Sequence, residues 1–344
     1  MIRALVAEDS AVTREYLVYL LGQDPGLEVA GAARDGQEAL DEARRLRPDV
    51  ILMDVHMPRM NGYEAARRIM EEVPTPIVMV SASLNKNEMG MMFEALQAGA
   101  LTVAEKPPGI GHPDHADMAR RLVETVKSMA EVKVVRRWPK RERPAPPPRP
   151  APPSPRKIRL IAIGASTGGP MALSEILGNL PEDLGVPVLV VQHIAAGFAP
   201  GLAEWLGKQT PLAVKLAEAE EAARPGVVHL APDGWQMGVT KDLRIRLARV
   251  PSDGSFCPSV DHLLQSVAES HGGSAIGVLL TGMGRDGAQG LLRLRQAGGV
   301  CIAQDEESSV IFGMPGEAVR LGAAEFVLAL EGIARAIRSI TMQG

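Results

Sequence analysis

Three polar residues in the second half of the chain lie where their side chains can do chemistry together. Ser166, His193 and Asp286 each follow a short run rich in Val, Ile, Leu and Gly, which is the pattern of a buried strand in a parallel sheet. Chemistry in an open sheet of that kind gathers in the crevice beyond the carboxyl ends of the strands. A hydroxyl, an imidazole and a carboxylate at one such edge are the parts of a nucleophilic triad. The pattern therefore predicts a catalytic serine, with His193 as its base and Asp286 orienting that base.

Other partners for Ser166 stay open from the residues alone. Ser166 stands in the segment Gly-Ala-Ser-Thr-Gly-Gly-Pro, which fits a G-x-S-x-G nucleophile turn but is also compatible with a structural glycine-rich turn. His229 is an alternative base, and Asp261 and Asp233 are weaker alternatives for the acid. The backbone N–H of Met283 is a candidate oxyanion-hole donor, which contributes about 3 kcal/mol when aimed correctly.

The first half of the chain carries acidic residues at the ends of its expected strands. Glu8 and Asp9 end the first strand, Asp54 ends the third, Ser81 ends the fourth, and Lys106 follows the fifth. Three carboxylates at one sheet edge repel one another unless a cation lies among them, and Mg²⁺ with its preference for oxygen ligands is suited to that place. Asp54 is then able to attack a phosphoryl donor, while Lys106 balances the new charge and Ser81 hydrogen-bonds a phosphoryl oxygen.

Length, charge and cysteine content limit the class of protein. The chain has 344 residues, a formal net charge of -4 and two cysteines. This length allows two domains with ordinary cores, and the charge excludes the basic footprint of a nucleic-acid-binding protein. Two cysteines are too few for a disulfide framework. Since no apolar run reaches the ~18 residues needed to cross a bilayer, we expect a cytoplasmic protein without direct membrane insertion.

A proline- and arginine-rich stretch divides the chain. Residues 139–155 read PKRERPAPPPRPAPPSP, a composition that favours an extended, semi-rigid spacer. We therefore expect a first domain over residues 1–125, a linker over 126–156 and a second domain over 157–344.

Both domains alternate apolar strands with amphipathic stretches, which is typical of doubly wound α/β folds. The first domain is predicted to be flavodoxin-like with a five-stranded parallel sheet, and the second to be a doubly wound, mainly parallel α/β catalytic domain. The expected strands are Ile2–Ala7, Val29–Ala32, Val50–Asp54, Ile77–Ser81 and Leu101–Ala104, then Arg159–Gly164, Val186–His193, Val227–Ala231, Ala275–Thr281 and Gly299–Gln304.

The first domain resembles a response-regulator receiver domain. The motifs that carry the resemblance are Ala-Glu-Asp-Ser, Met-Asp-Val-His-Met-Pro-Arg-Met-Asn-Gly, Val-Ser-Ala and Glu-Lys-Pro. The resemblance implies that Asp54 is the phosphoacceptor and that Ser81 and Lys106 are switch residues. It further implies a Mg²⁺ site made by Glu8, Asp9, Asp54 and the backbone carbonyl of His56.

The receiver resemblance also implies a cis peptide between Lys106 and Pro107. Two positions depart from the usual pattern. Val103 stands where receivers usually have an aromatic switch residue, and His56 stands where this class of regulator often has an acidic residue. We expect the phosphorylation chemistry to survive both departures.

Residues 157–344 resemble the CheB-type protein-glutamate methylesterase domain of chemotaxis. The matching segments include the Ser166 turn, Val-Val-Gln-His-Ile-Ala-Ala-Gly-Phe, Pro-Ser-Val-Asp, Leu-Thr-Gly-Met-Gly-Arg-Asp-Gly and Phe-Gly-Met-Pro-Gly. The resemblance implies that Thr167 and Met283 bind substrate or shape the oxyanion hole. Gln236 stands where the family often has histidine, and we expect this change to alter substrate contacts locally.

These features together predict a phosphorylation-activated esterase. By resemblance, Ser166 hydrolyses glutamate γ-methyl esters on the cytoplasmic helices of chemoreceptors, and the same site has the chemistry to deamidate receptor glutamines. A chemotaxis histidine kinase is the expected phosphodonor. Two alternatives are a receiver-controlled serine hydrolase with a different ester or amide substrate, and a non-catalytic, receiver-gated binding module.

Overall fold

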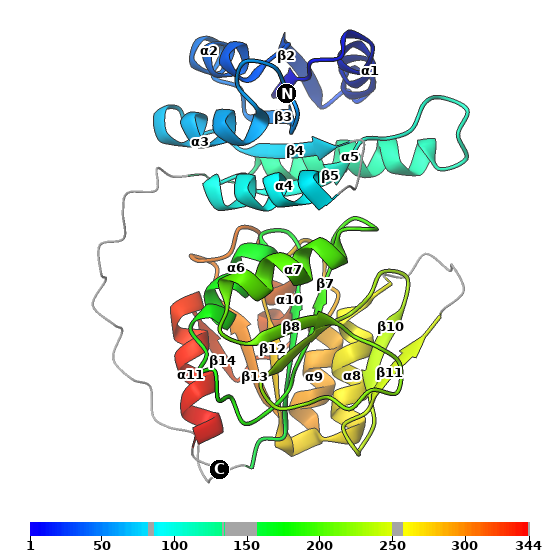
Figure 1. Cartoon of the computed structure of the whole chain (residues 1–344), viewed down its shortest axis with the longest axis vertical. Coiled ribbons are helices and arrows are strands. Elements are labelled where there is room, and N and C mark those ends of the chain that lie inside the picture. Colours follow the sequence, from blue (N-terminus) through cyan, green and yellow to red (C-terminus); the bar gives the residue numbers. More distant parts are fainter. Residues whose placement is uncertain (82–85, 133, 135–156, 250–256, 343–344) are drawn as a thin grey trace. The chain divides into compact units, whose positions relative to one another are not determined.

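The structure is a computed structural model that describes residues 1–81, 86–132, 134, 157–249 and 257–342. The chain divides into two compact units, Met1–Pro146 and Pro147–Gly344, each built on its own sheet (Figure 1). The proline-rich stretch 139–155 lies outside the described residues. Residues 126–130, predicted as the start of the linker, instead continue the last helix of the first unit.

The first unit is a five-stranded parallel sheet in the order β2-β1-β3-β4-β5. Its helices pack in two groups, α1 with α5 and α2 with α3 and α4. The elements are β1 (Ile2–Ala7), α1 (Ala11–Gly22), β2 (Leu27–Ala33), α2 (Gly36–Leu46), β3 (Val50–Asp54), α3 (Gly62–Glu72), β4 (Ile77–Ser81), α4 (Lys86–Ala98), β5 (Thr102–Glu105) and α5 (His115–Ala130).

Sequence accounts for where these elements begin and end. The strands β3 and β4 are buried along their whole length, as expected for an apolar run covered by helices on both faces. Three helices begin at a polar residue whose side chain accepts from a backbone N–H of the first turn, namely Ser10, Asp35 and Asn61. Such capping satisfies donors that have no partner within the helix.

The second unit has a seven-stranded parallel sheet in the order β14-β13-β12-β6-β7-β9-β8. A two-stranded antiparallel hairpin lies apart from this sheet. The elements are β6 (Leu160–Ala165), α6 (Gly169–Gly178), β7 (Val188–Gln192), α7 (Ala199–Gln209), β8 (Ala213–Leu216), β9 (Val227–Leu230), β10 (Gln236–Val239), β11 (Ile245–Ala248), α8 (Val260–Ser270), a short 3₁₀ helix (Gly272–Ser274), β12 (Ala275–Leu279), α9 (Ala288–Gln296), β13 (Val300–Gln304), α10 (Met314–Arg320), β14 (Phe326–Leu328) and α11 (Leu330–Met342).

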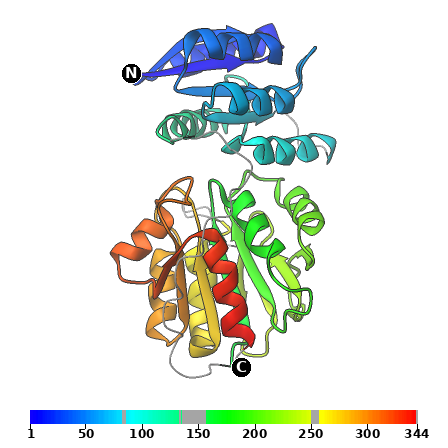
Figure 2. The same cartoon turned by 90° about the vertical axis from the view of Figure 1, so that its left-hand side faces the viewer.

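Helices cover both faces of this second sheet (Figures 1 and 2). α6, α7 and α11 pack together, while α8, α9 and α10 form the other layer, with the β10–β11 hairpin packed on α8. The sheet is therefore doubly wound, and the predicted fold class is confirmed in both units. The strand order reverses between β6 and β12, which makes the carboxyl end of β6 the expected place for a site.

Three details go beyond or against the predictions. The short strands β8 and β14 at the sheet edges and the β10–β11 hairpin were not predicted. The expected cis peptide at Lys106–Pro107 is wrong, because the cis bond found among the described residues is Cys257–Pro258.

In the part of the chain that the structure describes, every helix is too short or too polar to span a bilayer.

Candidate functional site

Ser166 and His193 leave neighbouring strands at the same edge of the second sheet. The last residues of β6 and β7, Ala165 and Gln192, are register partners, so Ser166 and His193 are the next residues beyond them. The backbone N–H of His193 donates to the carbonyl of Ala165 at 2.9 Å. Since adjacent strands lie about 4.8 Å apart, the serine and the imidazole are brought side by side.

Glycines let the chain turn sharply around Ser166. Gly168 has φ +78° and precedes α6, in whose first turn Pro170 stands. Gly282, which follows β12, approaches so closely that a Cβ placed on it would lie 2.7 Å from the Cβ of Ser166. The serine is therefore held between the start of α6 and the loop after β12.

Asp286 is brought to His193 from the third strand of the site, β12. Its Oδ2 lies 2.9 Å from Nε2 of His193, and the carboxylate is 8% exposed. Its other donors come from the start of α8: the Ser259 hydroxyl at 2.9 Å, the Val260 N–H at 2.7 Å and the Asp261 N–H at 3.0 Å. The amino end of α8 therefore holds a negative charge where backbone donors and the helix dipole favour it.

The surroundings keep Asp286 ionised. Burial raises the pKa of its carboxyl, but the hydrogen bond and charge of His193 and the N–H groups of Asp261 and Val260 outweigh burial and lower the pKa below its ordinary value. A carboxylate that stays charged can fix the tautomer of His193 and stabilise its protonated form. Asp261 behaves differently: burial raises its pKa, the Gly290 N–H opposes this, and the charge of Asp286 adds to the rise.

Buried polar side chains support the backbone of this site. The Gln192 side-chain amide donates to the carbonyls of Ser166 and His193 at 2.7 and 2.8 Å. Thr281 accepts the Ile311 N–H at 3.0 Å and donates to the Thr167 carbonyl at 2.9 Å. These contacts tie the serine turn to the histidine and to the loop after β12.

The two residues predicted to shape the oxyanion hole each adjoin a residue of this arrangement, Ser166 or Gly282. Thr167 follows the serine directly and is half-buried, while Met283 follows Gly282 and has 45% of its surface exposed. Their positions agree with roles at the substrate side of the site, which stay predictions.

The alternative base and acids are occupied elsewhere. His229 is buried in β9, and its Nδ1 lies 3.1 Å from a carboxylate oxygen of Glu221. Asp233 accepts the Gly197 N–H at 2.7 Å. Asp261 accepts the Gly290 N–H at 2.6 Å, which joins α8 to α9. None of these three contacts brings its residue to Ser166.

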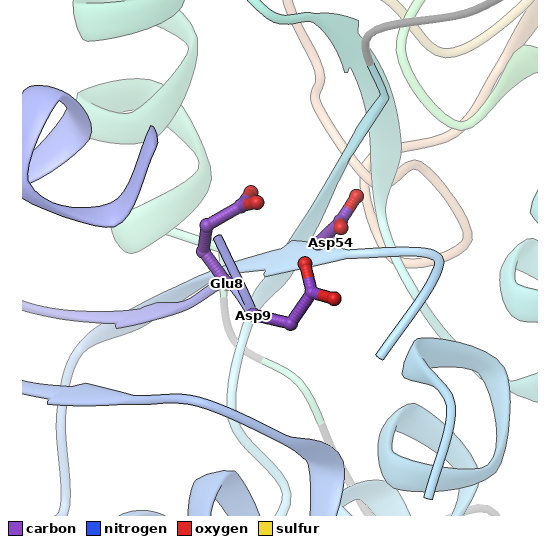
Figure 3. Close-up of side chains that lie close together, drawn as sticks. All are labelled: Glu8, Asp9 and Asp54. Atoms are coloured by element: carbon purple, nitrogen blue, oxygen red, sulfur yellow. The ribbon is translucent and has the colours of Figure 1, made fainter. Parts of the chain in front are cut away.

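The first unit gathers its acidic residues at the carboxyl ends of β1 and β3. Oxygen atoms of Glu8, Asp9 and Asp54 all lie within 4.8 Å of one another (Figure 3). Glu8 and Asp54 are buried, and Asp9 is exposed. His56 is exposed two residues beyond Asp54.

Lys106 bridges the two buried carboxylates of this cluster. Its Nζ lies 2.6 Å from Oε2 of Glu8 and 2.9 Å from Oδ1 of Asp54. Its backbone N–H donates to the carbonyl of Ser81 at 2.9 Å, and Ser81 is buried at the end of β4. The predicted phosphoacceptor and both predicted switch residues therefore meet at one edge.

This cluster fits a small divalent cation. Burial raises the pKa of Glu8 and of Asp54, Lys106 opposes the rise at both groups, and nearby negative charge adds to it. Clustered carboxylate oxygens with raised pKa values are relieved by a cation, and oxygen donors are those that Mg²⁺ prefers. Glu8, Asp9 and Asp54 are thus suited to hold Mg²⁺.

The residues that hydrogen-bond to the triad residues or to their direct partners were not predicted from the sequence. Gln192 had a visible signal, since it is a polar residue at the end of an otherwise apolar strand. Ser259 stands before Val-Asp and could have been recognised as a helix cap. Gln236, whose departure from the usual histidine was expected to alter substrate contacts locally, is 4% exposed, and its Oε1 accepts the Ser259 N–H at 2.7 Å.

Comparisons with known proteins find relatives that align with the whole chain and family models that match each of its two units. The model of the CheB methylesterase family matches residues 161–337, and that of the response regulator receiver domain matches residues 4–112. A Geobacter metallireducens protein named protein-glutamate methylesterase/protein-glutamine glutaminase 4 is 49% identical, with 100% of both chains covered. A Myxococcus xanthus protein of the same name is 50% identical, with 98% of this chain and 96% of that one covered.

A solved structure supports the assignment of the second unit. The Thermotoga maritima CheB methylesterase catalytic domain aligns with a TM-score of 0.51 and 36% identity, covering 53% of this chain and 98% of that one. The resemblances predicted from the motifs are thereby confirmed. The chain belongs to the CheB methylesterase family, with a response regulator receiver domain ahead of its methylesterase domain.

Proposed function

We propose that this chain is a phosphorylation-activated protein-glutamate methylesterase and protein-glutamine glutaminase that acts on chemoreceptors. The observation that carries the proposal is that Nε2 of His193 lies 2.9 Å from Oδ2 of Asp286, while Ser166 follows the strand β6 that pairs with β7 on one side and β12 on the other. Relatives that align over the full chain bear this pair of activities in their names.

The esterase reaction starts at the Ser166 hydroxyl. Its Oγ attacks the carbonyl carbon of a glutamate γ-methyl ester while His193 takes the hydroxyl proton, and Asp286 stabilises the resulting imidazolium. Because Nε2 of His193 faces Asp286, we assign the proton transfer to Nδ1. The C–O bond then breaks, and methanol leaves with the proton from His193.

Water completes the cycle. His193 removes a proton from water as the water oxygen attacks the acyl-enzyme, and returns that proton to Oγ of Ser166 as the ester bond to the serine breaks. The glutamic acid product ionises by losing its proton to solvent. A glutamine side chain passes through the same kind of tetrahedral intermediate and releases ammonia in place of methanol. The backbone N–H of Met283 would stabilise the oxyanion in both reactions, and Thr167 would bind substrate or shape the same oxyanion hole.

The first unit supplies the control. We infer that Asp54 accepts a phosphoryl group from a chemotaxis histidine kinase, with Lys106 and Ser81 contacting the phosphoryl oxygens. Glu8, Asp9, Asp54 and the backbone carbonyl of His56 would hold Mg²⁺, which when bound neutralises charge on the transferring phosphoryl group. Phosphorylation then shifts the equilibrium between a less active and a more active state of the chain. A change of a few kcal/mol in the free-energy difference between these two states is enough for such a shift.

We also propose the boundaries and the setting of this activity. The receiver covers residues 1–130, since its last helix ends at Ala130, the linker follows up to residue 156, and the catalytic domain covers 157–344. The substrates, cytoplasmic helices of methylated chemoreceptors, place the protein in the cytoplasm without insertion into the membrane.

The direct test of the proposed function is loss of receptor methyl esters. Methylated cytoplasmic receptor fragments are incubated with the full chain, and ester loss is followed by mass spectrometry. We expect loss with the parent and with Ser174→Ala, a matched serine change on α6, but none with Ser166→Ala. Labelling of Ser166 by a fluorophosphonate without ester loss would instead favour another ester or amide substrate. Receptor signalling supported by Ser166→Ala would favour a binding module.

A further inference from the structure

Gln236 connects the β10–β11 hairpin to the catalytic machinery. It is the first residue of β10, is 4% exposed, and lies in a hairpin that is not part of the main sheet. Its side-chain Oε1 accepts the backbone N–H of Ser259 at 2.7 Å. Ser259 is the capping residue of α8, so the hairpin contacts the residue that directly precedes this helix.

Ser259 carries the connection on to Asp286. Its hydroxyl donates to Oδ1 of Asp286 at 2.9 Å and accepts the His262 N–H at 3.2 Å. The next backbone N–H groups, of Val260 and Asp261, also donate to Asp286. Besides His193, the donors to this carboxylate found among the described residues therefore come from three consecutive residues, whose positions depend on where the first turn of α8 lies.

We propose that Gln236 is a positioning residue of the esterase, which aims the Asp286 carboxylate at His193 by anchoring Ser259. The proposal deepens the proposed function and rests on it. The path consists of three contacts of 2.7, 2.9 and 2.9 Å, from Gln236 to Ser259, from Ser259 to Asp286 and from Asp286 to His193. Each intermediate group is held within hydrogen-bond reach of the next.

An amide is suited to this place because it accepts a hydrogen bond without a charge. Asp286 and Asp261 already put two carboxylates at the amino end of α8, and the charge of Asp286 raises the pKa of Asp261. A third negative charge would oppose ionisation of both groups. A neutral acceptor satisfies the Ser259 N–H and leaves the charge of Asp286 available to His193.

The test is a double-mutant cycle in the full chain. Gln236→Met removes the acceptor and keeps the length of the side chain. It is combined with Asp286→Asn, and Gln265→Met on α8 is the matched control. Two rates are measured: kcat for receptor demethylation, and the rate at which a fluorophosphonate labels Ser166. Thermal melting of each variant reports on folding.

We expect Gln236→Met to lower kcat about tenfold, since an unpaired buried donor carries a penalty of that order. KM should stay within about twofold, because Gln236 is buried and the substitution is expected to act through the carboxylate of Asp286. In the Asp286→Asn background the same substitution should change either rate by less than about twofold. Gln265→Met should match the parent.

Two results would overturn the inference. One is parent-like kcat and labelling in Gln236→Met, and the other is an equal loss in both backgrounds. If Gln236→Met melts below the assay temperature, Gln236→Asn, which shortens the side chain and withdraws the acceptor from the Ser259 N–H, replaces it in the cycle and carries the same expectations. If the parent protein is labelled at Ser166 but does not demethylate receptors, the proposed function is contradicted and the inference about Gln236 is not. The inference is then tested by the labelling rates of the four proteins in the cycle.

Discussion

Replacement of Gly282 by alanine is the smallest change that should disable Ser166 without touching it chemically. The added Cβ would lie 2.7 Å from the Ser166 Cβ and 3.2 Å from the Ser166 backbone nitrogen, and it would also meet the sulfur of Met314. The backbone of Gly282 has little freedom to withdraw. Its N–H donates to Ile311, and its carbonyl accepts from Gly313 and Met314.

The size of the effect follows from these distances. Carbon atoms in contact lie about 3.5–4.0 Å apart, so relief of the clash moves Ser166 by about 1 Å. A displacement of that size at reacting groups costs about 100-fold in rate. Overpacking of the same site should also reduce the free energy of unfolding by about 1–3 kcal/mol.

The assay is the rate of Ser166 labelling by a fluorophosphonate, measured at a temperature where Gly282→Ala is folded by circular dichroism. Gly185→Ala is the matched control, because a Cβ at this exposed glycine would have no atom within 4 Å. We expect parent-like labelling in Gly185→Ala and about 100-fold slower labelling in Gly282→Ala. Equal labelling rates in a folded Gly282→Ala would refute the placement of Ser166 against this loop.

Three further outcomes are expected. Asp286→Asn should lower kcat by about 10⁴-fold, because the buried amide holds His193 in the wrong tautomer; a loss below tenfold, measured by methanol release, would argue against the triad. Asp54→Asn should abolish stimulation of the esterase by a small-molecule phosphodonor, and retained stimulation would move the phosphoacceptor elsewhere. Burial lowers the pKa of His229, with Glu221 opposing, so the unfolded chain binds a proton below about pH 6.5 that the folded chain resists. The free energy of unfolding should therefore fall as the pH drops through that value, and urea titrations should show a shallower fall in His229→Gln; an unchanged slope would contradict this.

The sequence predicted the fold well where apolar runs are long and sharply bounded. β1, β3 and β4 begin and end at the predicted residues, because buried parallel strands need continuous apolar side chains and end at polar ones. The edge strands β8 and β14 are short and partly exposed. They carry too few apolar residues to stand out from a loop.

The candidate sites were predictable for a related reason. Ser166, His193 and Asp286 follow central strands, so strand order alone brings them to one edge. The contact between Gln236 and Ser259 was not predictable, because these residues meet through a hairpin packed on α8. A tertiary contact of this kind leaves no periodic signal in the chain.

Methanol release from methylated receptor fragments, measured with and without Mg²⁺ and a small-molecule phosphodonor, tests the central claim most directly. The account predicts that the full chain releases methanol, that Mg²⁺ with phosphodonor raises the rate, and that Ser166→Ala releases none under either condition. Methanol release that persists in Ser166→Ala would contradict the assignment of the nucleophile. A rate of methanol release that is the same with and without phosphodonor would contradict control of the esterase by the receiver.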